Sequence, residues 1–582
     1  MRVPSAEDRS AWTAVDQPTI RALTDRARAT LGTPWPTPLA HDFARFHRDG
    51  DRDTYEQAVW GRHRRLARAA ALAAVTLDPV WLDEVTDGVI LFCEQSTWSW
   101  PGHDDTRDRY GSVLPVTTDP CLDLGAGEVA ADLSWIDHVL GAHLDGHVPG
   151  LRARIRFEVD RRVLTPFTER RDWHWLGLDG HVHNWNPWIH GNVLVATLAL
   201  VDDPQRRQHL IGLVTEGLDR FGAALPADGA VDEGIQYWWY GACRYLEALE
   251  MLGVTAPKPA VLAYPHRVHL GGFWYVNHAD GQARPSSEQP WHVLHRLARR
   301  YGDTEAEAHA AARRRPGEPV AHESPGLGYL LLALTDPVWA AARPGPSPLP
   351  RHVWFPSAQV LLARPEAGSP AGLTLAVKGG HNGENHNHND VGSFIVARDG
   401  VPVLVDPGRP TYTAQTFGPH RYEIWTMRSS WHNTPTIRGA EQAPGREFAA
   451  RAVTADDCSL TLDLAGAYPR DDIRGWVRSA RLDRATGTIT IRDSWELTPG
   501  AGPTVIHLVI AGEVTVSDGS AQAGGVTITW APARPAPCTV VVRELDDPML
   551  SSVWGDRLTR LDIDVTALGP VGTLELTVKE TR

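Results

Sequence analysis

The hydrophobic pattern of this chain changes its period once, and that change constrains the fold more than any other feature. In the first part of the chain, apolar side chains recur at helical spacing, as in Asp53–Leu77, Leu151–Phe167 and Asp232–Leu252. After the proline-rich stretch Arg343–Arg351, short segments such as LTLAVKG and GVTITW alternate apolar with polar residues, which is typical of antiparallel strands. The sequence therefore predicts stacked helical hairpins followed by an antiparallel β-sandwich or barrel.

The length and charge of the chain narrow the class of protein. Its 582 residues are enough for two large domains, and the change of period places these at residues 1–345 and 346–582. A net charge of −14 argues against a nucleic-acid partner and against binding to a membrane surface. The first residues, MRVPSAEDRSAW, lack the apolar core of a signal peptide, and the five cysteines are scattered without a CxxC pair. We therefore expect a cytoplasmic protein without a disulfide framework, compatible with a homo-oligomer.

The segment Gly379–Phe394, GGHNGENHNHNDVGSF, holds the densest group of chemically active side chains. A polar run of this kind is costly to bury unless its members find partners. The alternative interpretation is a solvated loop rich in turn-forming Asn and Asp. In an extended conformation alternate residues share one face. One face would then hold Glu384, His386, His388 and Asp390.

Two later residues extend this group of candidate metal ligands. Asp406 lies at a strand-to-turn position in VLVDPG, and His432 lies in SWHNTP. Two histidines and one aspartate are an ordinary ligand set for Zn²⁺. The residues alone leave two arrangements open: both His386 and His388 bind a metal, as in a cupin, or one is a ligand and the other is free for catalysis. A cupin would require Glu where this chain has Gly392.

The segment His181–Asn192, HVHNWNPWIHGN, marks the start of a predicted helix. Pro187 suits the first position of a helix and Asn186 suits its N-cap. No such structural role explains Asn184 or His190. The two tryptophans of NWNPW would form either a platform for a sugar ring or a part of the core.

The segment Asp232–Leu252 has the buried stripe of a helix, and Tyr237, Tyr240 and Arg244 fall on a different face. Such a face is either plain surface or a means of lowering the pKa of a phenol, because a nearby cation and a helix N-terminus both favour the phenolate. Two aromatic loops add candidates of the kind that line clefts, namely His103, Asn277, His278 and Asp280.

Taken together, these segments resemble the heparinase II/III family of polysaccharide lyases. The resemblance spans nearly the whole chain and implies a multidomain α and β protein, with an N-terminal (α/α) toroid of helical hairpins and a C-terminal antiparallel β-sandwich. It also implies cleavage of an acidic, uronate-containing oligosaccharide or polysaccharide by β-elimination, which leaves a 4,5-unsaturated uronate end. The motifs that carry it are NHNHNDVGSF (Asn385–Phe394), VLVDPG (Val403–Gly408), RYEIWTMRSSWHNTP (Arg421–Pro435), NWNPW (Asn184–Trp188) and DEGIQYW (Asp232–Trp238).

The same resemblance assigns roles to individual residues. Tyr237 matches the family's catalytic tyrosine and His386 its catalytic histidine, while Asn184 or Asn186 matches the asparagine that faces the substrate carboxylate. We expect further contacts to the substrate from Asn186, Trp188, His190, Tyr240, His103 and Arg421.

The resemblance also implies one structural metal ion per chain, zinc rather than calcium. Its ligands would be His388, Asp406 and His432. The ion would orient His386 through its neighbour His388 and would not activate water.

The chemistry of β-elimination explains these residue types. The C5 proton of a uronate is weakly acidic, so the adjacent carboxylate must be neutralised while charge develops in the transition state. Asn184 and His386 suit that task, and Tyr237 can take the proton and return it to the leaving oxygen. Tyr240, one turn further on, is the rival base. Positive potential for an acidic substrate is expected from Arg421, Arg428 and Arg438.

Two other functions are compatible with the same architecture. A glycoside hydrolase on the toroid would need two carboxylates flanking the scissile bond, either Asp232 with Glu233 or Glu94 with Asp104. A carbohydrate-binding protein without catalytic activity would bind oligosaccharide and release no product.

Overall fold

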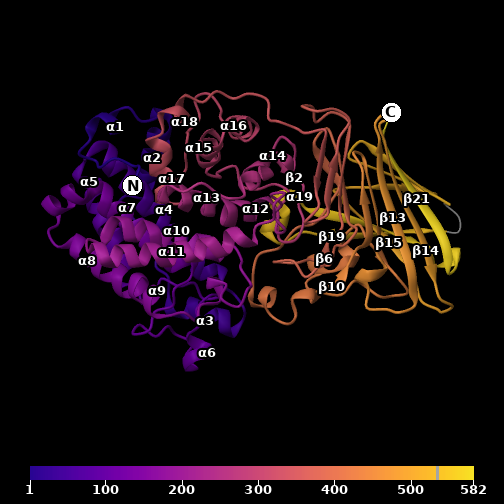
Figure 1. Ribbon diagram of the computed structural model, residues 1–582, viewed down its shortest axis with the longest axis horizontal. Coiled ribbons are helices and arrows are strands. Elements are labelled where there is room, and N and C mark those ends of the chain that lie inside the picture. Colours follow the sequence, from indigo (N-terminus) through magenta and orange to yellow (C-terminus); the bar gives the residue numbers. More distant parts are fainter. Residues whose placement is uncertain (533–535, 582) are drawn as a thin grey trace. The chain divides into compact units, whose positions relative to one another are not determined.

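The computed structural model describes residues 1–532 and 536–581, whose internal contacts separate into two units (Figure 1). We call them the helical unit and the strand unit. Two segments from within the predicted N-terminal domain group with the C-terminal residues. The helical unit comprises Met1–Leu225, Trp239–Leu262 and Glu288–Pro346, and the strand unit comprises Pro226–Trp238, Ala263–Ser287 and Ser347–Arg582.

Six helices of the helical unit form a closed ring. Each contacts the next, and the last of the six, α17, contacts both α4 and α7. Shorter or more polar helices follow the ring helices in sequence and pack outside them, so the unit is built from helical hairpins. The ring helices are α4 (Asp53–Thr76), α7 (Leu124–His147), α10 (Trp185–Leu200), α13 (Arg244–Leu252), α15 (Trp291–Tyr301) and α17 (Leu327–Leu334). Their partners include α5 (Pro79–Glu94), α8 (Leu151–Val159), α11 (Pro204–Ala224), α16 (Thr304–Ala311) and α18 (Pro337–Ala341).

Several helices begin at an Asp-Pro pair. In α5 and α11 the carboxylates of Asp78 and Asp203 accept hydrogen bonds from backbone N–H groups of the first turn, at 3.0 Å in both cases. The proline that follows occupies a position whose N–H needs no partner and whose φ angle already suits a helix. The same pair starts α18 and α19 (Pro548–Trp554). Among the described residues, no helix is long and apolar enough to cross a membrane.

The expected helices are present, with shifted ends. The helix that contains NWNPW begins at Trp185, two residues before the predicted start. The helical run in the segment from Asp232 begins only at Ile235, and Trp239–Cys243 forms a π turn between α12 (Ile235–Trp238) and α13. Because a π turn holds an extra residue, Tyr237, Tyr240 and Arg244 do not lie on one continuous α-helix, although Tyr240 and Arg244 both contact the ring of Trp188.

The strand unit contains two large sheets in which every recorded pairing is antiparallel. The first has the order β11-β12-β13-β14-β21-β18-β17-β16, and the second has the order β19-β20-β15-β8-β7-β5-β4-β3, with β9 (Pro435–Thr436) also paired to β15. The strands of the first are β11 (Arg451–Ala455), β12 (Ser459–Asp463), β13 (Ile473–Asp483), β14 (Thr488–Leu497), β16 (Thr515–Ser517), β17 (Ser520–Ala523), β18 (Val526–Ala531) and β21 (Val571–Glu580). Those of the second are β3 (His352–Phe355), β4 (Val360–Ala363), β5 (Leu373–Lys378), β7 (Phe394–Arg398), β8 (Val401–Leu404), β15 (Val505–Ala511), β19 (Cys538–Glu544) and β20 (Arg557–Asp564).

One apolar core joins the two sheets, and it encloses a buried ion pair. Alternate residues of β13 and β14 point into this core, where Trp476 stacks on Trp495 with ring centroids 4.8 Å apart. Arg478 is fully buried and binds both carboxylate oxygens of Asp493, at 2.9 and 2.8 Å. Its remaining amino group donates to the backbone oxygens of Gly392 and Asn433. The charge is therefore satisfied entirely by protein atoms.

We expect Asp493→Ala to lower the free energy of unfolding by about 3–5 kcal/mol, because it leaves the guanidinium of Arg478 buried without a counter-charge. The matched control is Glu496→Ala, which breaks the exposed pair of Glu496 with Arg474 across the same two strands, 3.0 Å apart. An exposed pair of this kind contributes less than about 1 kcal/mol. Scanning calorimetry of both variants checks the difference, and equal thermal shifts would contradict it.

Candidate functional site

The predicted site residues divide between the two units. Those in the helical unit are His103, Asn184, Asn186, Trp188, His190 and Tyr240. Those in the strand unit are Tyr237, His386, His388, Asp406, Arg421 and His432.

The three predicted metal ligands come together inside the strand unit. His388, Asp406 and His432 are buried, and each offers a ligand atom within 4.8 Å of the other two. They come from three loops: Asp406 follows β8, His388 precedes β7, and His432 precedes β9. The pairing of β7 with β8, and of β8 and β9 with β15, brings these loops together.

The hydrogen bonds around these residues leave atoms suited to a metal ion. His432 Nε2 donates to the backbone oxygen of Thr426 at 3.0 Å, so in the neutral ring the lone pair is on Nδ1, and this atom lies 2.7 Å from Asp406 Oδ2. Two acceptors at that distance repel each other unless a proton or a cation lies between them. His388 Nε2 is bound to Asp280, and no hydrogen-bond partner is found for the buried Nδ1 of His388 among the described residues. The residues therefore fit a divalent cation with mixed nitrogen and oxygen ligands.

The loop that carries His386 is not extended, contrary to the expectation for Gly379–Phe394. Between β6 (His381–Asn382) and β7 the backbone forms turns, and His386 itself has a left-handed φ of 49°. The predicted face of Glu384, His386, His388 and Asp390 is therefore not formed. Glu384 and Asp390 pair with the buried ammonium group of Lys378, while His386 forms a short hydrogen bond through Nδ1 to Glu233.

The structure brings Tyr237 and His386 together, although 148 residues separate them in sequence. Their rings stack with centroids 4.5 Å apart and an interplanar angle of 29°. Tyr237 is 5% exposed, and its phenol oxygen forms a short hydrogen bond to the phenol of Tyr412. Glu233 is also buried and belongs to the same segment as Tyr237, so one short stretch of chain supplies both the phenol and the partner of the imidazole.

The pKa of Tyr237 is raised well above its usual range, which corrects the expectation of a lowered value. Burial is the largest cause, and Tyr412 and the negative charge of Asp280 raise it further. Arg409 opposes them. The expected helix dipole is weak here, because α12 is only four residues long. Tyr237 is therefore a neutral phenol at neutral pH.

Asp280 accepts hydrogen bonds from three side chains near Tyr237. Its Oδ2 accepts from the Tyr412 hydroxyl at 2.7 Å, and its Oδ1 accepts from Arg421 at 2.9 Å and from His388 at 2.8 Å. Although burial raises the pKa of Asp280, the bond to His388 and the charge of Arg421 lower it well below its usual range. Asp280 is therefore a carboxylate in spite of its complete burial.

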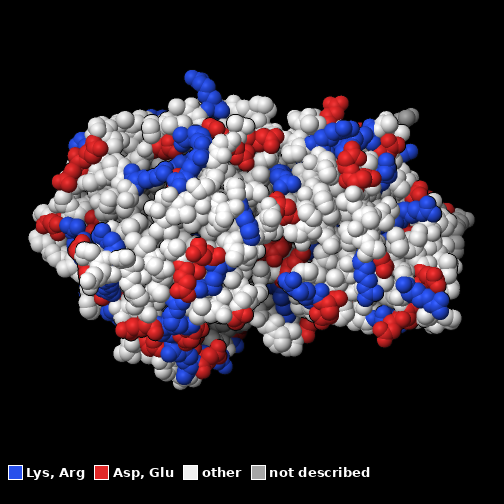
Figure 2. Space-filling model, viewed as in Figure 1, with Lys and Arg blue, Asp and Glu red and all other residues white. Residues whose placement is uncertain are grey.

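The three arginines expected to supply positive potential are each paired with a carboxylate. Arg421 pairs with Asp280, Arg428 pairs with Glu441, and Arg438 pairs with Asp472 at 2.7 Å. Their charges are thus largely neutralised, which corrects that expectation. On the face shown in Figure 2, blue Lys and Arg side chains are interspersed with red Asp and Glu side chains.

Three of the predicted substrate-binding residues of the helical unit lie in its core. Asn186 does not cap α10: it is fully buried and donates to the backbone oxygens of Trp175 and Leu176 at 3.2 and 3.4 Å. His190 is also fully buried and bonds to the backbone oxygen of Asn186 at 2.6 Å. Trp188 donates its indole N–H to Glu128. These side chains are buried at the start of α10, and their contact with substrate stays a prediction.

Asn184, His103 and Tyr240 have different surroundings. Asn184 is the N-cap of α10, and its buried Oδ1 has no hydrogen-bond partner among the described residues. His103 lies 4.2 Å from the ring of Trp185 and contacts Asp123 and Arg52, each at 3.1 Å. Tyr240 lies against Trp188, with ring centroids 4.9 Å apart.

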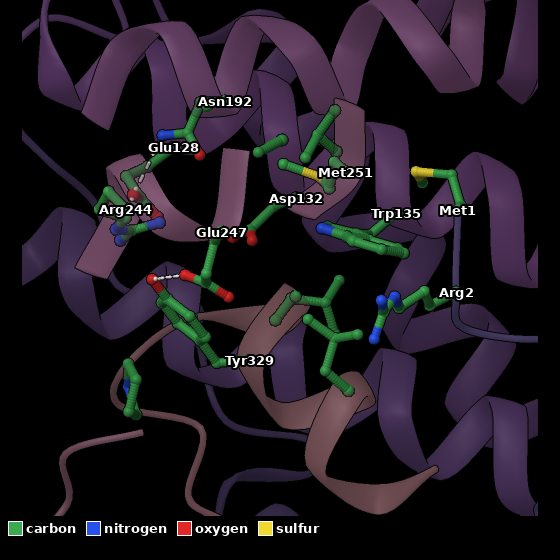
Figure 3. A pocket seen from close by; sticks show the side chains of 18 of the residues that line it. Met1, Arg2, Glu128, Asp132, Trp135, Asn192, Arg244, Glu247, Met251 and Tyr329 are labelled. Atoms are coloured by element: carbon green, nitrogen blue, oxygen red, sulfur yellow. Dashed lines mark hydrogen bonds and ion pairs between the residues drawn. The ribbon is translucent and has the colours of Figure 1, made fainter. Parts of the chain in front are cut away.

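The centre of the helical ring contains a cavity of about 80 Å³ (Figure 3). Glu128 lies on its wall and accepts hydrogen bonds from Asn192 at 3.1 Å and from Arg244 at 2.9 Å. Tyr329 donates to Glu247 at 2.7 Å, and the guanidinium of Arg244 lies 4.7 Å from the Tyr329 ring. These two carboxylates already have hydrogen-bond partners, which favours a structural role for them.

Sequence reasoning missed the importance of Glu233, Tyr412 and Asp280. Glu233 appeared only as a candidate hydrolase carboxylate, and Asp280 only as part of an aromatic loop. Tyr412 lies six residues after Asp406, in the turn GRPTYT. The sequence offered one indication that Tyr412 belongs to the site, namely its short distance along the chain from Asp406.

Comparisons with known proteins agree with this arrangement. Residues 368–524 match the family model described as Heparinase II/III-like, C-terminal. No curated protein matches the chain in sequence. Among solved structures, heparinase III has a TM-score of 0.60 at 11% identity, with 99% of this chain and 94% of that chain covered.

Two further structures have the same fold. A mutant of the heparan sulfate lyase from Pedobacter heparinus has a TM-score of 0.58 at 12% identity, covering 99% of this chain and 87% of the other. A mutant of the chondroitin AC lyase from Streptomyces coelicolor A3 has a TM-score of 0.57 at 14% identity, covering 98% and 82%. Residues 368–524 therefore resemble a heparinase II/III-like C-terminal domain, and the helical ring and antiparallel sheets of the chain have the (α/α) toroid and β-sandwich fold that the resemblance implies.

Proposed function

We propose that this protein is a polysaccharide lyase that cleaves a uronate-containing glycan by β-elimination. One observation carries the proposal: a buried phenol, Tyr237, stacks on the imidazole of His386, and His386 is held by Glu233. A phenol beside an imidazole provides two groups that can exchange protons with a bound sugar. The fold shared with heparan sulfate and chondroitin lyases supports the same class of reaction.

In the proposed reaction the phenolate form of Tyr237 takes the C5 proton and then, as the phenol, returns it to the departing glycosidic oxygen. The C5–H bond breaks, its electron pair forms the C4–C5 double bond, and the C4–O bond breaks with its pair on oxygen. His386 neutralises the uronate carboxylate as charge develops in it. Glu233 fixes the orientation of His386 through Nδ1 and leaves Nε2 for the substrate.

We expect Tyr237→Phe to lower kcat by about 10²–10⁴-fold with little effect on KM, because it removes only the proton-transferring oxygen. The assay is ultraviolet absorbance of the 4,5-unsaturated uronate, with oligomers of heparan, hyaluronan, alginate, pectic and bacterial exopolysaccharides as substrates. Tyr240→Phe is the matched control and should retain activity.

If Tyr240→Phe is inactive while Tyr237→Phe is not, the base is Tyr240. Reducing ends released without ultraviolet absorbance would identify a hydrolase instead, and binding without any product would identify a carbohydrate-binding protein.

The raised pKa of Tyr237 also predicts the pH dependence. A base whose pKa lies well above 10 is protonated at neutral pH, and its reactive phenolate fraction grows as the pH rises. We therefore expect kcat/KM to increase with pH from about 6 to 9, since kcat/KM reports the free enzyme. A pH–rate profile on one oligosaccharide measures this, and a rate that falls over that range would show that Tyr237 acts as the acid alone.

We propose that His388, Asp406 and His432 bind one Zn²⁺, which when present would hold the three loops in a fixed arrangement. Elemental analysis should then give about one equivalent of zinc per chain. His388→Ala should lose the metal and lower the thermal stability. The control is His420→Ala, which removes an exposed histidine paired with Glu423 on the surface. A metal-free protein whose stability His388→Ala leaves unchanged would contradict the proposal.

A further inference from the structure

The hydrogen bonds around Asp280 connect two parts of the strand unit that have separate roles in the proposed function. One carboxylate oxygen binds His388, a proposed metal ligand, at 2.8 Å. The other binds Tyr412 at 2.7 Å, and Tyr412 in turn contacts the phenol oxygen of Tyr237. Asp280, His388 and Tyr237 are buried and Tyr412 is half-buried, so most of this chain of contacts is shielded from water.

The direction of each hydrogen bond follows from the partners of Asp280, because the guanidinium of Arg421 can only donate and so makes Asp280 the acceptor. A carboxylate only accepts, so His388 Nε2, Arg421 and the Tyr412 hydroxyl all donate to it. The hydroxyl hydrogen of Tyr412 is therefore donated to Asp280. Tyr412 can only accept from Tyr237, and the Tyr237 hydrogen is thereby directed towards Tyr412.

The same directions fix the tautomer of His388. Because its Nε2 carries the hydrogen that is donated to Asp280, its Nδ1 has the lone pair that a metal ion requires. A carboxylate behind a ligating imidazole orients the ring and raises its basicity. Asp280 thus sets both the ligand atom of His388 and the hydrogen-bond direction at Tyr237.

We propose that Asp280 and Tyr412 are positioning residues for the lyase reaction, and that Asp280 couples the proposed metal site to the reacting phenol of Tyr237. This inference rests on the proposed function. It adds a physical route by which a metal ion that touches no substrate affects catalysis: the ion fixes His388, His388 fixes Asp280, and Asp280 fixes the phenol pair through Tyr412. Neither residue exchanges a proton with the sugar in this scheme.

The test compares Tyr412→Phe, Asp280→Ala and the double variant, all at saturating zinc. Tyr412→Phe should lower kcat by about 10–100-fold, the cost of a misplaced reacting group, with KM and zinc affinity unchanged. Asp280→Ala should lower kcat and also weaken zinc binding by about 10–100-fold, measured by competition with a chromophoric chelator. Because both residues act through one route, the double variant should have a kcat no lower than that of Asp280→Ala alone.

Tyr110→Phe is the matched control. It removes a phenol that also donates to a carboxylate, that of Asp119, at a half-exposed position in the helical unit. Wild-type kcat in Tyr412→Phe, loss of zinc affinity in Tyr412→Phe, or multiplicative losses in the double variant would each overturn the inference.

A second measurement does not depend on activity. Removal of zinc from the wild-type protein should change the ultraviolet difference spectrum of its tyrosines, and this change should be absent in Asp280→Ala. Identical difference spectra in the two proteins would overturn the coupling. If the wild type forms no unsaturated product from any glycan while the spectra differ as expected, the proposed function fails and the link from metal to phenol stands.

Discussion

The strand unit depends on one interaction, the ion pair between the buried guanidinium of Arg478 and Asp493. The guanidinium lies in the apolar core between the sheets, and its charge is compensated by Asp493. Its free N–H groups reach the backbone oxygens of Gly392 and Asn433, which border the loops of His388 and His432. A charge without water must have protein partners in fixed positions. The same contacts that satisfy Arg478 therefore hold two loops of the candidate site.

The side chain of Asn433 continues this arrangement towards the metal ligands. Its amide donates to the backbone oxygens of Phe394 and Val405, at 2.6 and 3.2 Å, and its carbonyl accepts from Val509 at 2.7 Å. One asparagine thus joins the start of β7 and the end of β8, from which two loops of the site extend, to the interior of β15. Since the neighbouring residue is His432, the position of that imidazole follows from the sheet.

Burial also decides the electrostatics of the reacting groups. Asp280 keeps its charge because His388 and Arg421 surround it, and that charge helps to keep Tyr237 protonated. A phenol in water beside a cation would behave in the opposite way. The charge state of the site is thus a property of the whole buried network. In the helical unit, Glu128 and Glu247 are likewise held by hydrogen bonds, to Arg244 and Tyr329.

The sequence by itself predicted the helical first part and the antiparallel second part, and its resemblance to a family assigned the three proposed metal ligands. It could do so because hydrophobic period is a local property, and because the motifs around His388, Asp406 and His432 are contiguous. Tyr237 and His386 were identified by resemblance, but their stacking required segment 226–238 to group with the strand unit, which no local pattern specifies.

Only the tertiary structure decided which polar side chains meet. It placed His190 and Asn186 in the core, paired Arg421 with Asp280, and brought Tyr412 to Tyr237. It also raised the pKa of Tyr237, where reasoning from one helix face gave a lowered value. The physical reason is that burial and long-range charge pairing depend on contacts between residues far apart in the chain, whereas periodicity and turn chemistry depend on near neighbours.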